Sequence, residues 1–426
     1  MWRTIAVVLL VTSCGAAASS PPDLSTTPPT PAPTVPASAD TTANVAPSTI
    51  IEKTVDSDSA FPARLALRTN DGHVITFSEG RDPIDTPGVM GPFGEVVVSS
   101  DTIGDRSTIE WHSLATDEVF ASIQVDGVVR PTAISEDGNL VALIGIVGKQ
   151  TTVVLATPSQ GEVRRWTFDA LLVPEAFANA YVPDGDGLPI GVFVIEYLAA
   201  DTYRVRVIDT ATGELGLPLN LRDKSQTVDD VMTAVSRTAV FEPMNQLLFT
   251  LYQDATENGE NVGSFIHTLG LVNGVWCLDV PAELGLADNP GALAVSPDGS
   301  RLFAASSIGG VAGYNVSDIT ASGPEMPEAR ATTSVGASAQ RVAIGASRNE
   351  VVLALGGSLF RLDPATLAVR DSFNWDMDIE ALTVLDDGRL VIVGTRRMTL
   401  VSADNQLLDE APIGDIGEVT RVDVVG

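Results

Sequence analysis

Short apolar runs separated by polar turns recur along the chain from about residue 61 to its end. In one recurring unit, two runs rich in Val, Leu, Ile and Ala flank a tight turn, with looser copies beginning at Ala239 and Val342. Its clearest copies are residues 132–144, 292–304 and 381–393. Each of these turns holds an Asp-Gly pair, and glycine supplies the positive φ that such a turn needs at little steric cost. The unit therefore predicts a β-hairpin.

A second hairpin with a polar turn follows the first in most copies. Its versions are residues 109–119, 153–163, 205–215 and 360–369. Together the two units make four strands in about 40 to 60 residues, which is the size of one propeller blade. The repeat therefore predicts an all-β fold, a β-propeller of four-stranded blades.

The number of blades follows from the first strand of each unit. These strands are expected near residues 87, 131, 177, 238, 291, 341, 379 and 419. The last of them, residues 419–426, ends the chain without the rest of its blade, whereas residues 63–68 and 73–77 have the pattern of later strands. We expect the C-terminal strand to pair with this N-terminal hairpin, because closing the ring removes an exposed sheet edge. The count favours eight blades, and seven is the alternative if one weak module is not a blade.

Two motifs carry a resemblance to known propellers. Ser296-Pro-Asp-Gly299 and Asp209-Thr-Ala-Thr-Gly-Glu214 are similar to the signatures of bacterial WD-repeat-like and YVTN-type β-propellers. The resemblance covers roughly residues 61–426 and implies the fold. It does not select a function, since these families include binding scaffolds, sensors and some hydrolases. Residues 274–281 also resemble a segment of actinobacterial surface propellers, which implies a lipoprotein of that type.

The start of the chain has the features of an export signal. Residues 1–13 combine one positive charge with an apolar run too short to span a bilayer. Val11-Thr12-Ser13-Cys14 resembles the bacterial lipobox, which implies cleavage before Cys14 and its lipidation by palmitate. The protein is then expected on the outer face of the bacterial cytoplasmic membrane, attached through lipid alone. Cleavage after the alanines at 16–18 is the alternative and would give a secreted protein.

Between this signal and the propeller domain, residues 61–426, lies a stretch rich in Ala, Pro, Ser and Thr. Residues 14–60 carry almost no charge or bulk, so they are expected to form a disordered linker that holds the domain away from the anchor.

Charge and cysteine content limit the partners and the chemistry. The chain has 25 Lys and Arg against 55 Asp and Glu, a net charge of −30, which repels phosphate backbones and argues against a nucleic-acid partner. If Cys14 carries lipid, Cys277 has no disulfide partner, and its apolar run indicates a buried, inert thiol. We expect a monomer.

No catalytic or metal-binding constellation is predicted. His73, His112 and His267 fall on later strands of different blades, with no pair spaced for one metal. Residues 145–151 differ from a phosphate-binding loop at its required positions and are interpreted as a loop between strands. No cofactor is expected; calcium at Asp184 and Asp186, or at residues 254–260, is the weaker alternative to solvated acidic turns.

Ligands of propellers usually bind on the face where loops lead into the innermost strands. The candidate ligand-binding residues at these loops are Arg130, Glu175, Arg237, Asp288, Asn289, Gln340, Trp375, Asp376, Asp378, Glu380 and Arg421. The favoured cluster is Trp375 with Asp376 and Asp378, because an aromatic face with acids suits a sugar or a cationic group. The alternative is that these residues pair with one another and wall the channel.

Three functions remain open from these residues. The first is a non-enzymatic propeller that binds an envelope protein, a peptide or an envelope polysaccharide. The second is a propeller hydrolase or lactonase with a metal in the channel, for which acids are available but the histidines are badly placed. The third is a sensor or assembly factor that partners another envelope protein.

Overall fold

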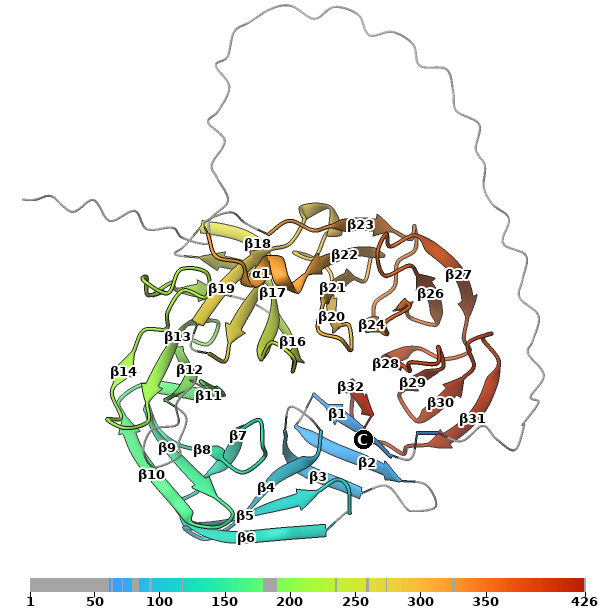
Figure 1. The fold of residues 1–426 in the computed structure, drawn as a ribbon. Helices are drawn as coiled ribbons and strands as arrows, with labels where there is room; N and C mark the ends of the chain where they lie inside the picture. Colours follow the sequence, from blue (N-terminus) through green and yellow to red (C-terminus); the bar gives the residue numbers. More distant parts are fainter. Residues whose placement is uncertain are drawn as a thin grey trace, which may run out of the picture.

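The computed structural model describes residues 61–424, apart from positions 63, 71, 79–83, 92–93, 117, 179–189, 234–235, 258–259, 273 and 324–326. The signal segment, Cys14 and the linker lie outside the described residues, as do Asp184 and Asp186 of the first calcium candidate. The described chain forms eight four-stranded blades around a central axis (Figure 1). The predicted β-propeller and its count of eight are confirmed.

The first four blades hold the following strands, in order from the innermost to the outermost. Blade 1 consists of β32 (Val419–Val424), β1 (Arg64–Thr69), β2 (His73–Ser78) and the first half of β3 (Ile84–Met90). Blade 2 consists of the second half of β3, β4 (Val96–Ile103), β5 (Arg106–Ser113) and β6 (Glu118–Asp126). Blade 3 consists of β7 (Arg130–Ile134), β8 (Val141–Val147), β9 (Gln150–Thr157) and β10 (Gly161–Phe168). Blade 4 consists of β11 (Leu171–Ala178), β12 (Gly191–Tyr197), β13 (Thr202–Asp209) and β14 (Leu215–Gly216).

The other four blades follow the same order. Blade 5 consists of β16 (Ser236–Glu242), β17 (Leu247–Glu257), β18 (Glu260–Gly270) and β19 (Gly274–Asp279). Blade 6 consists of β20 (Gly291–Val295), β21 (Arg301–Ser306), β22 (Gly310–Asn315) and β23 (Ala331–Ser334). Blade 7 consists of β24 (Val342–Ala346), β25 (Val351–Leu355), β26 (Ser358–Leu362) and β27 (Val369–Asn374). Blade 8 consists of β28 (Ile379–Val384), β29 (Leu390–Gly394), β30 (Arg397–Val401) and β31 (Leu407–Pro412).

The ring closes as the sequence predicts. The C-terminal strand β32 pairs antiparallel with β1, with Leu65 opposite Val424 and Leu67 opposite Val422. The first blade is thus built from both ends of the domain, and the pairing covers the inner edge of β1.

The Asp-Gly turns have the predicted backbone. Gly138, Gly299 and Gly388 adopt φ values of 71°, 66° and 84°. In the first turn the Asp137 carboxylate accepts a hydrogen bond from Ser135 Oγ at 2.6 Å, and Asp298 makes the same contact with Ser296 Oγ at 2.6 Å. Acidic and hydroxyl side chains therefore fix the turn while glycine supplies its conformation.

The innermost strand of blade 4 starts earlier than predicted. It begins at Leu171 rather than near residue 177. Pro174 lies within this strand, at a shift of register between Pro174 and Ala176. Proline cannot donate to a strand ladder, and a bulge accommodates it. A short strand β15 (Met232–Thr233), on the connection between β14 and β16, pairs with both β13 and β17, which joins blades 4 and 5 into one sheet.

The apolar core lies between the faces of neighbouring blades. Its largest fully buried side chains include Trp111, Tyr314, Phe193, Phe249 and Phe303. Short helical segments occur at η1 (Ala282–Leu284) and α1 (Val316–Thr320). Of the helices in the described part of the chain, none has the length and apolar character needed to cross a membrane.

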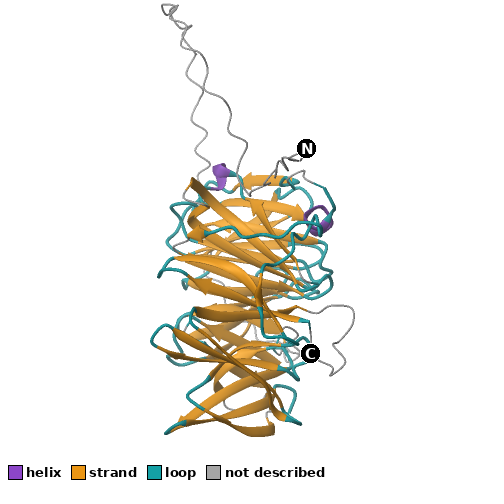
Figure 2. Cartoon of the chain, turned by 90° about the vertical axis from the view of Figure 1, so that its left-hand side faces the viewer, coloured by secondary structure: helices purple, strands orange, loops and turns teal. Residues whose placement is uncertain are grey.

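Viewed from the side, the strands run across the thickness of the disc and the loops gather on its two faces (Figure 2). We use the term rim face for the face at which the innermost strands begin. The β1 strand starts on the opposite face, because Leu65 lies beside Val424 at the end of β32. The chain therefore enters the domain on the side away from the rim face.

Candidate functional site

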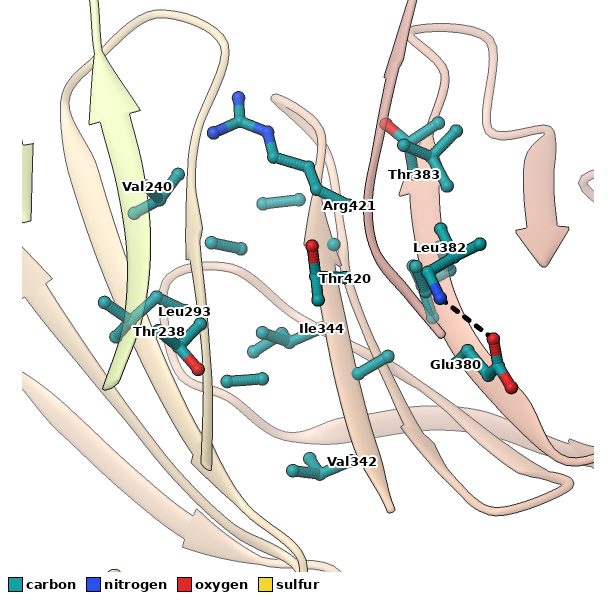
Figure 3. Close-up of a pocket in the computed structure, with 18 of the residues that line it drawn as sticks. Thr238, Val240, Leu293, Val342, Ile344, Glu380, Leu382, Thr383, Thr420 and Arg421 are labelled. Carbon is teal, nitrogen blue, oxygen red and sulfur yellow. Dashed lines mark hydrogen bonds between the residues drawn. The ribbon is translucent and has the colours of Figure 1, made fainter. Parts of the chain in front are cut away.

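A cavity of about 640 Å³ lies along the inner strands of five blades. Its lining residues come from β16, β20, β24, β28 and β32, that is, from blades 5 to 8 and blade 1. Figure 3 shows Val240 and Thr238 on β16 and Leu382 and Thr383 on β28, with their side chains around this space. The volume lies within the range of ordinary ligand pockets, about 300–1,000 Å³.

The cavity wall combines many small and aliphatic side chains with polar groups, and the polar groups supply slightly more of its exposed surface. Ala239, Ala292, Ala294 and Ala343 line it, because a strand close to the axis of the ring has little room for larger side chains. Larger aliphatic residues, among them Leu293 and Ile344, complete the wall (Figure 3). Such a wall offers both apolar surface and hydrogen-bonding groups to a ligand.

An ion-pair network occupies the rim end of the cavity. The Glu380 side chain is 2% exposed and lies 2.8 Å from Arg341 Nη1, measured at Oε1. Thr395 Oγ1 donates to the same oxygen at 3.0 Å. The backbone N–H of Val419 donates to Glu380 Oε2 at 3.0 Å. Glu380 of blade 8 therefore ties blade 7 to the first residue of the closing strand, which is a structural use of its carboxylate.

A second network lies further along β32. Asp423 accepts hydrogen bonds from Arg421 Nε at 2.7 Å and from Arg68 Nε at 2.9 Å. Burial by itself would raise the pKa of Asp423, but the two guanidinium groups outweigh it and hold that pKa below its ordinary value. Asp423 is thus kept as a carboxylate between two cations.

The structure brings together some of the predicted site residues. Gln340, Glu380 and Arg421 line the cavity. Arg130 is exposed at the start of β7, and Glu175 lies half-buried within β11. Arg237 is the second residue of β16, and its side chain lies outside the described set. Thus three of the predicted residues meet at one cavity.

The predicted site residues just before β20, Asp288 and Asn289, do not line the cavity, and Asn289 makes hydrogen bonds near its own loop. Asn289 Nδ2 donates to the carbonyl of Gly285 at 2.7 Å, and the Asn289 carbonyl accepts from the amide of Gln253. Asp288 is exposed beside it, and the cavity is lined by the next two residues, Pro290 and Gly291.

The favoured cluster of Trp375, Asp376 and Asp378 lies on the connection between blades 7 and 8 and not among the residues that line the cavity. The Trp375 ring packs edge-on against Phe373, with ring centroids 6.3 Å apart, and the Trp375 backbone N–H donates to the Gly357 carbonyl at 2.7 Å. Asp376 accepts a hydrogen bond from Arg397 of blade 8. These contacts attach the connection to the two blades that it joins.

Four charged residues of the cavity were not predicted from the sequence: Arg341, Asp386, Glu418 and Asp423. Arg341 and Glu418 flank the starts of innermost strands, so their position next to predicted strand starts was an available signal. Asp423 lies at the far end of β32, and its partner Arg68 lies on the second strand of blade 1. Their proximity depends on ring closure, and no local motif marks it.

The remaining sequence candidates take the following positions. His73, His112 and His267 lie on β2, β5 and β18, each the third strand of its blade, as predicted. Cys277 is buried on β19. Within the described ranges, no group of three or more His, Cys, Asp or Glu side chains is placed to hold a metal ion. Of the second calcium candidate, residues 254–257 end β17 and Glu260 begins β18, and the side chains of these residues lie outside the described set.

Solved structures of other propellers resemble this chain, but their sequence identity to it is low. No protein-family model matches the chain, and no curated protein matches it. Sqt1 of Saccharomyces cerevisiae is 13% identical with a TM-score of 0.47, and the match covers 78% of this chain and 85% of that chain. BamB of Moraxella catarrhalis is 13% identical with a TM-score of 0.46, covering 78% and 89%. AztD of Citrobacter koseri is 10% identical with a TM-score of 0.44, covering 84% and 96%. Likeness at this level carries no information about function.

Proposed function

We propose that this protein is an exported lipoprotein whose propeller binds a protein or peptide segment at the channel cavity, outside the bacterial cytoplasmic membrane. In this proposal residues 1–13 are the signal, Cys14 carries the lipid, residues 14–60 are the linker and residues 61–426 are the binding domain. The proposed binding role is non-enzymatic.

The observation that carries the proposal is the state of the carboxylates beside the cavity. Glu380 is held by Arg341, Thr395 and the Val419 N–H, and Asp423 is held between Arg421 and Arg68. A carboxylate that acts as a general base needs a lone pair that is free to accept a proton from the substrate. Glu380 and Asp423, already engaged by cations and donors, stabilise the wall, and the mixed apolar and polar surface between them is the part that would meet a ligand.

The path of the chain is compatible with access to the cavity. Because β1 starts on the face opposite the rim face, a linker that precedes it and ends in a lipid would attach to the domain on that opposite face. A disordered linker sets no fixed orientation, but one attached there leaves the rim face uncovered.

Site-specific photo-crosslinking tests the proposal. The photoreactive residue p-benzoylphenylalanine is placed at Gln340 or Thr420, both of which line the cavity, and in a control at Val369 on outer strand β27. After irradiation in intact cells, cross-linked peptides are identified by mass spectrometry. We expect the same protein segment from positions 340 and 420, and not from position 369.

A cavity-filling variant completes the test. Thr238→Trp places a large side chain in the cavity and should abolish the cross-link from position 420. Equal cross-linking from position 369, or cross-links to polysaccharide alone, would reject a protein or peptide ligand. Turnover of ester or lactone substrates by the wild-type protein, lost in Thr238→Trp, would favour the hydrolase instead.

A further inference from the structure

Large aliphatic side chains are exposed at the tips of blades 2 and 3. Ile103 at the end of β4 is 78% exposed, and Val128 between β6 and β7 is 63% exposed. Ile146 and Val147 at the end of β8 are 43% and 82% exposed. We call these four residues the apolar ridge. A single exposed aliphatic residue needs no explanation, whereas a group of them on neighbouring loops indicates an interaction surface.

All four residues lie on the rim face. The pairing of Ile103 with Arg106 and of Val147 with Gln150 places them at hairpin tips beyond the starts of the innermost strands. Val128 lies on the connection that leads into Arg130, the first residue of β7. The ridge therefore lies on blades 2 and 3, while the cavity is lined by blade 1 and blades 5 to 8 (Figure 1).

Hydrogen bonds hold the parts of the ridge together. Gly127 N–H donates to the Asp105 carbonyl at 2.7 Å, in the turn that follows Ile103. Ser107 Oγ donates to the Gly127 carbonyl and accepts from the Val129 N–H, both at 2.9 Å. On the other side, a Cβ added to Gly145 would lie 2.8 Å from the Val128 carbonyl oxygen. Val128 is thus fixed between the tips of blades 2 and 3, which makes the ridge a prearranged surface.

The charges around the ridge indicate which class of molecule it fits. Arg106 is paired with Asp126 at 3.0 Å, and Asp101 and Asp105 are exposed beside Ile103. At the blade 3 end, Lys149 and Arg130 are exposed two residues from Val147 and Val128, and the whole chain carries a net charge of −30. Surfaces that bind lipid usually combine Lys or Arg with Trp or Phe. The ridge lacks Trp and Phe, and its acids lie at the blade 2 end, beside Ile103. At that end it is complementary to an apolar segment with basic flanks.

We infer that the apolar ridge is a second docking surface, separate from the cavity, for a protein segment that carries an apolar strip flanked by Lys or Arg. The apolar strip would cover Ile103, Val128 and Val147, and the basic flanks would lie near Asp101 and Asp105. This inference does not depend on what the cavity binds.

Peptide binding measured by fluorescence anisotropy tests this assignment. The probes are three labelled helical peptides of equal length: an amphipathic Leu/Lys peptide, a Ser/Lys peptide of the same charge, and an amphipathic Leu/Glu peptide. The ridge variant is Ile103→Ser/Val147→Ser. The matched control is Val119→Ser/Val369→Ser, whose side chains are 48% and 47% exposed on outer strands β6 and β27.

We expect the Leu/Lys peptide to bind the wild-type protein and the control equally, and to bind the ridge variant at least tenfold more weakly. The Ser/Lys and Leu/Glu peptides should bind at least tenfold more weakly than Leu/Lys. Unchanged melting temperatures show that both variants fold, since all four substitutions replace exposed side chains. The cavity variant Thr238→Trp should bind the Leu/Lys peptide as the wild type does, which separates this result from the test of the cavity.

Three results would overturn the inference. The first is equal binding of the Leu/Lys peptide to the wild-type protein and the ridge variant. Binding of the Ser/Lys peptide to the wild-type protein as tight as that of the Leu/Lys peptide would count in the same way, because it would mean attraction by net charge alone. The second is association with phosphatidylglycerol–phosphatidylethanolamine vesicles that the ridge variant loses, which would make the ridge a lipid-binding surface. The third is wild-type self-association in sedimentation velocity that the ridge variant loses, which would make the partner a second copy.

Discussion

Leu67 and Val422 lie directly opposite each other on adjacent antiparallel strands, although they come from the two ends of the domain. Both side chains are buried in the same apolar cluster, together with residues of blade 8. Their pairing joins the N-terminal hairpin to the C-terminal strand. The wall of the cavity depends on it, because β32 supplies Thr420, Arg421 and Asp423 to that wall.

The position of Asp423 between two cations predicts a pH-dependent contribution to stability. Its folded-state pKa is lowered below that of an unfolded Asp, about 3.9, so the carboxylate stabilises the fold at neutral pH. That contribution is lost as the pH falls below about 4 and through the lower folded-state pKa. Asp423→Asn should therefore melt at a lower temperature than wild type at pH 7, and the difference should shrink at pH 3.

The control for this prediction is Asp126→Asn, which removes an exposed carboxylate paired with Arg106. Exposed ion pairs contribute about 0–1 kcal/mol, so this variant should melt close to wild type at both pH values. A difference for Asp423→Asn that is the same at pH 7 and pH 3 would show that the carboxylate charge is not what stabilises the site.

Arg361 of blade 7 predicts a large loss of stability on truncation. Its buried guanidinium contacts both carboxylate oxygens of Glu350 at 2.7 Å and donates to Asn405 Oδ1 of blade 8 at 2.9 Å. Removing one partner of a buried ion pair leaves the other charge uncompensated, at a cost of about 3–5 kcal/mol. Arg361→Ala should lower the free energy of unfolding by about that amount in urea titration.

A surface arginine provides the comparison for Arg361. Arg389 pairs with Asp387 at 2.7 Å, but both side chains are partly exposed. Arg389→Ala should change the free energy of unfolding by about 1 kcal/mol or less. Similar losses for the two alanine variants would mean that the contacts of Arg361 between blades 7 and 8 are not formed.

Gly299 predicts the cost of a side chain in a repeated turn. It has a φ of 66°, and an added Cβ would lie 2.1 Å from Glu242 Oε1, whose carboxylate is buried and bound to the Met244 and Asn245 N–H groups. Gly104 has a φ of 69° with open space around it. Gly299→Ala should therefore lower the melting temperature by clearly more than Gly104→Ala. The Gly104→Ala variant is destabilised only by the strain of a positive φ at alanine. Equal melting temperatures of the two variants would contradict the close contact between blades 5 and 6.

The fold was predictable wherever local residues determine it. The Asp-Gly turns at Gly138, Gly299 and Gly388 mark the repeats, and the incomplete first and last blades reveal the closure. Pro174 concealed the start of β11, because a proline inside an apolar run argues against a strand unless a bulge accommodates it.

The candidate site was predictable only in part. Gln340, Glu380 and Arg421 lie near the starts of innermost strands, so the repeat places them at the cavity. The side chain of Trp375 packs against Phe373, and this direction depends on tertiary contacts that a repeat pattern does not contain. The pairing of Arg68 with Asp423 joins the two ends of the domain and becomes visible once the ring is closed.

Disulfide formation between Leu67→Cys and Val422→Cys tests the closure of the ring most directly. Opposite residues on paired strands have Cβ atoms about 4.5–5.5 Å apart, close enough for a disulfide after a small adjustment. The structure predicts that the double variant, made with Cys277→Ala, oxidises to an intramolecular disulfide in the monomer and melts at a higher temperature when oxidised than when reduced. The control pair Leu67→Cys/Val240→Cys, on β1 and β16, should stay reduced. If Leu67→Cys/Val422→Cys also stays reduced, or forms disulfides only between molecules, β32 does not close the ring on β1.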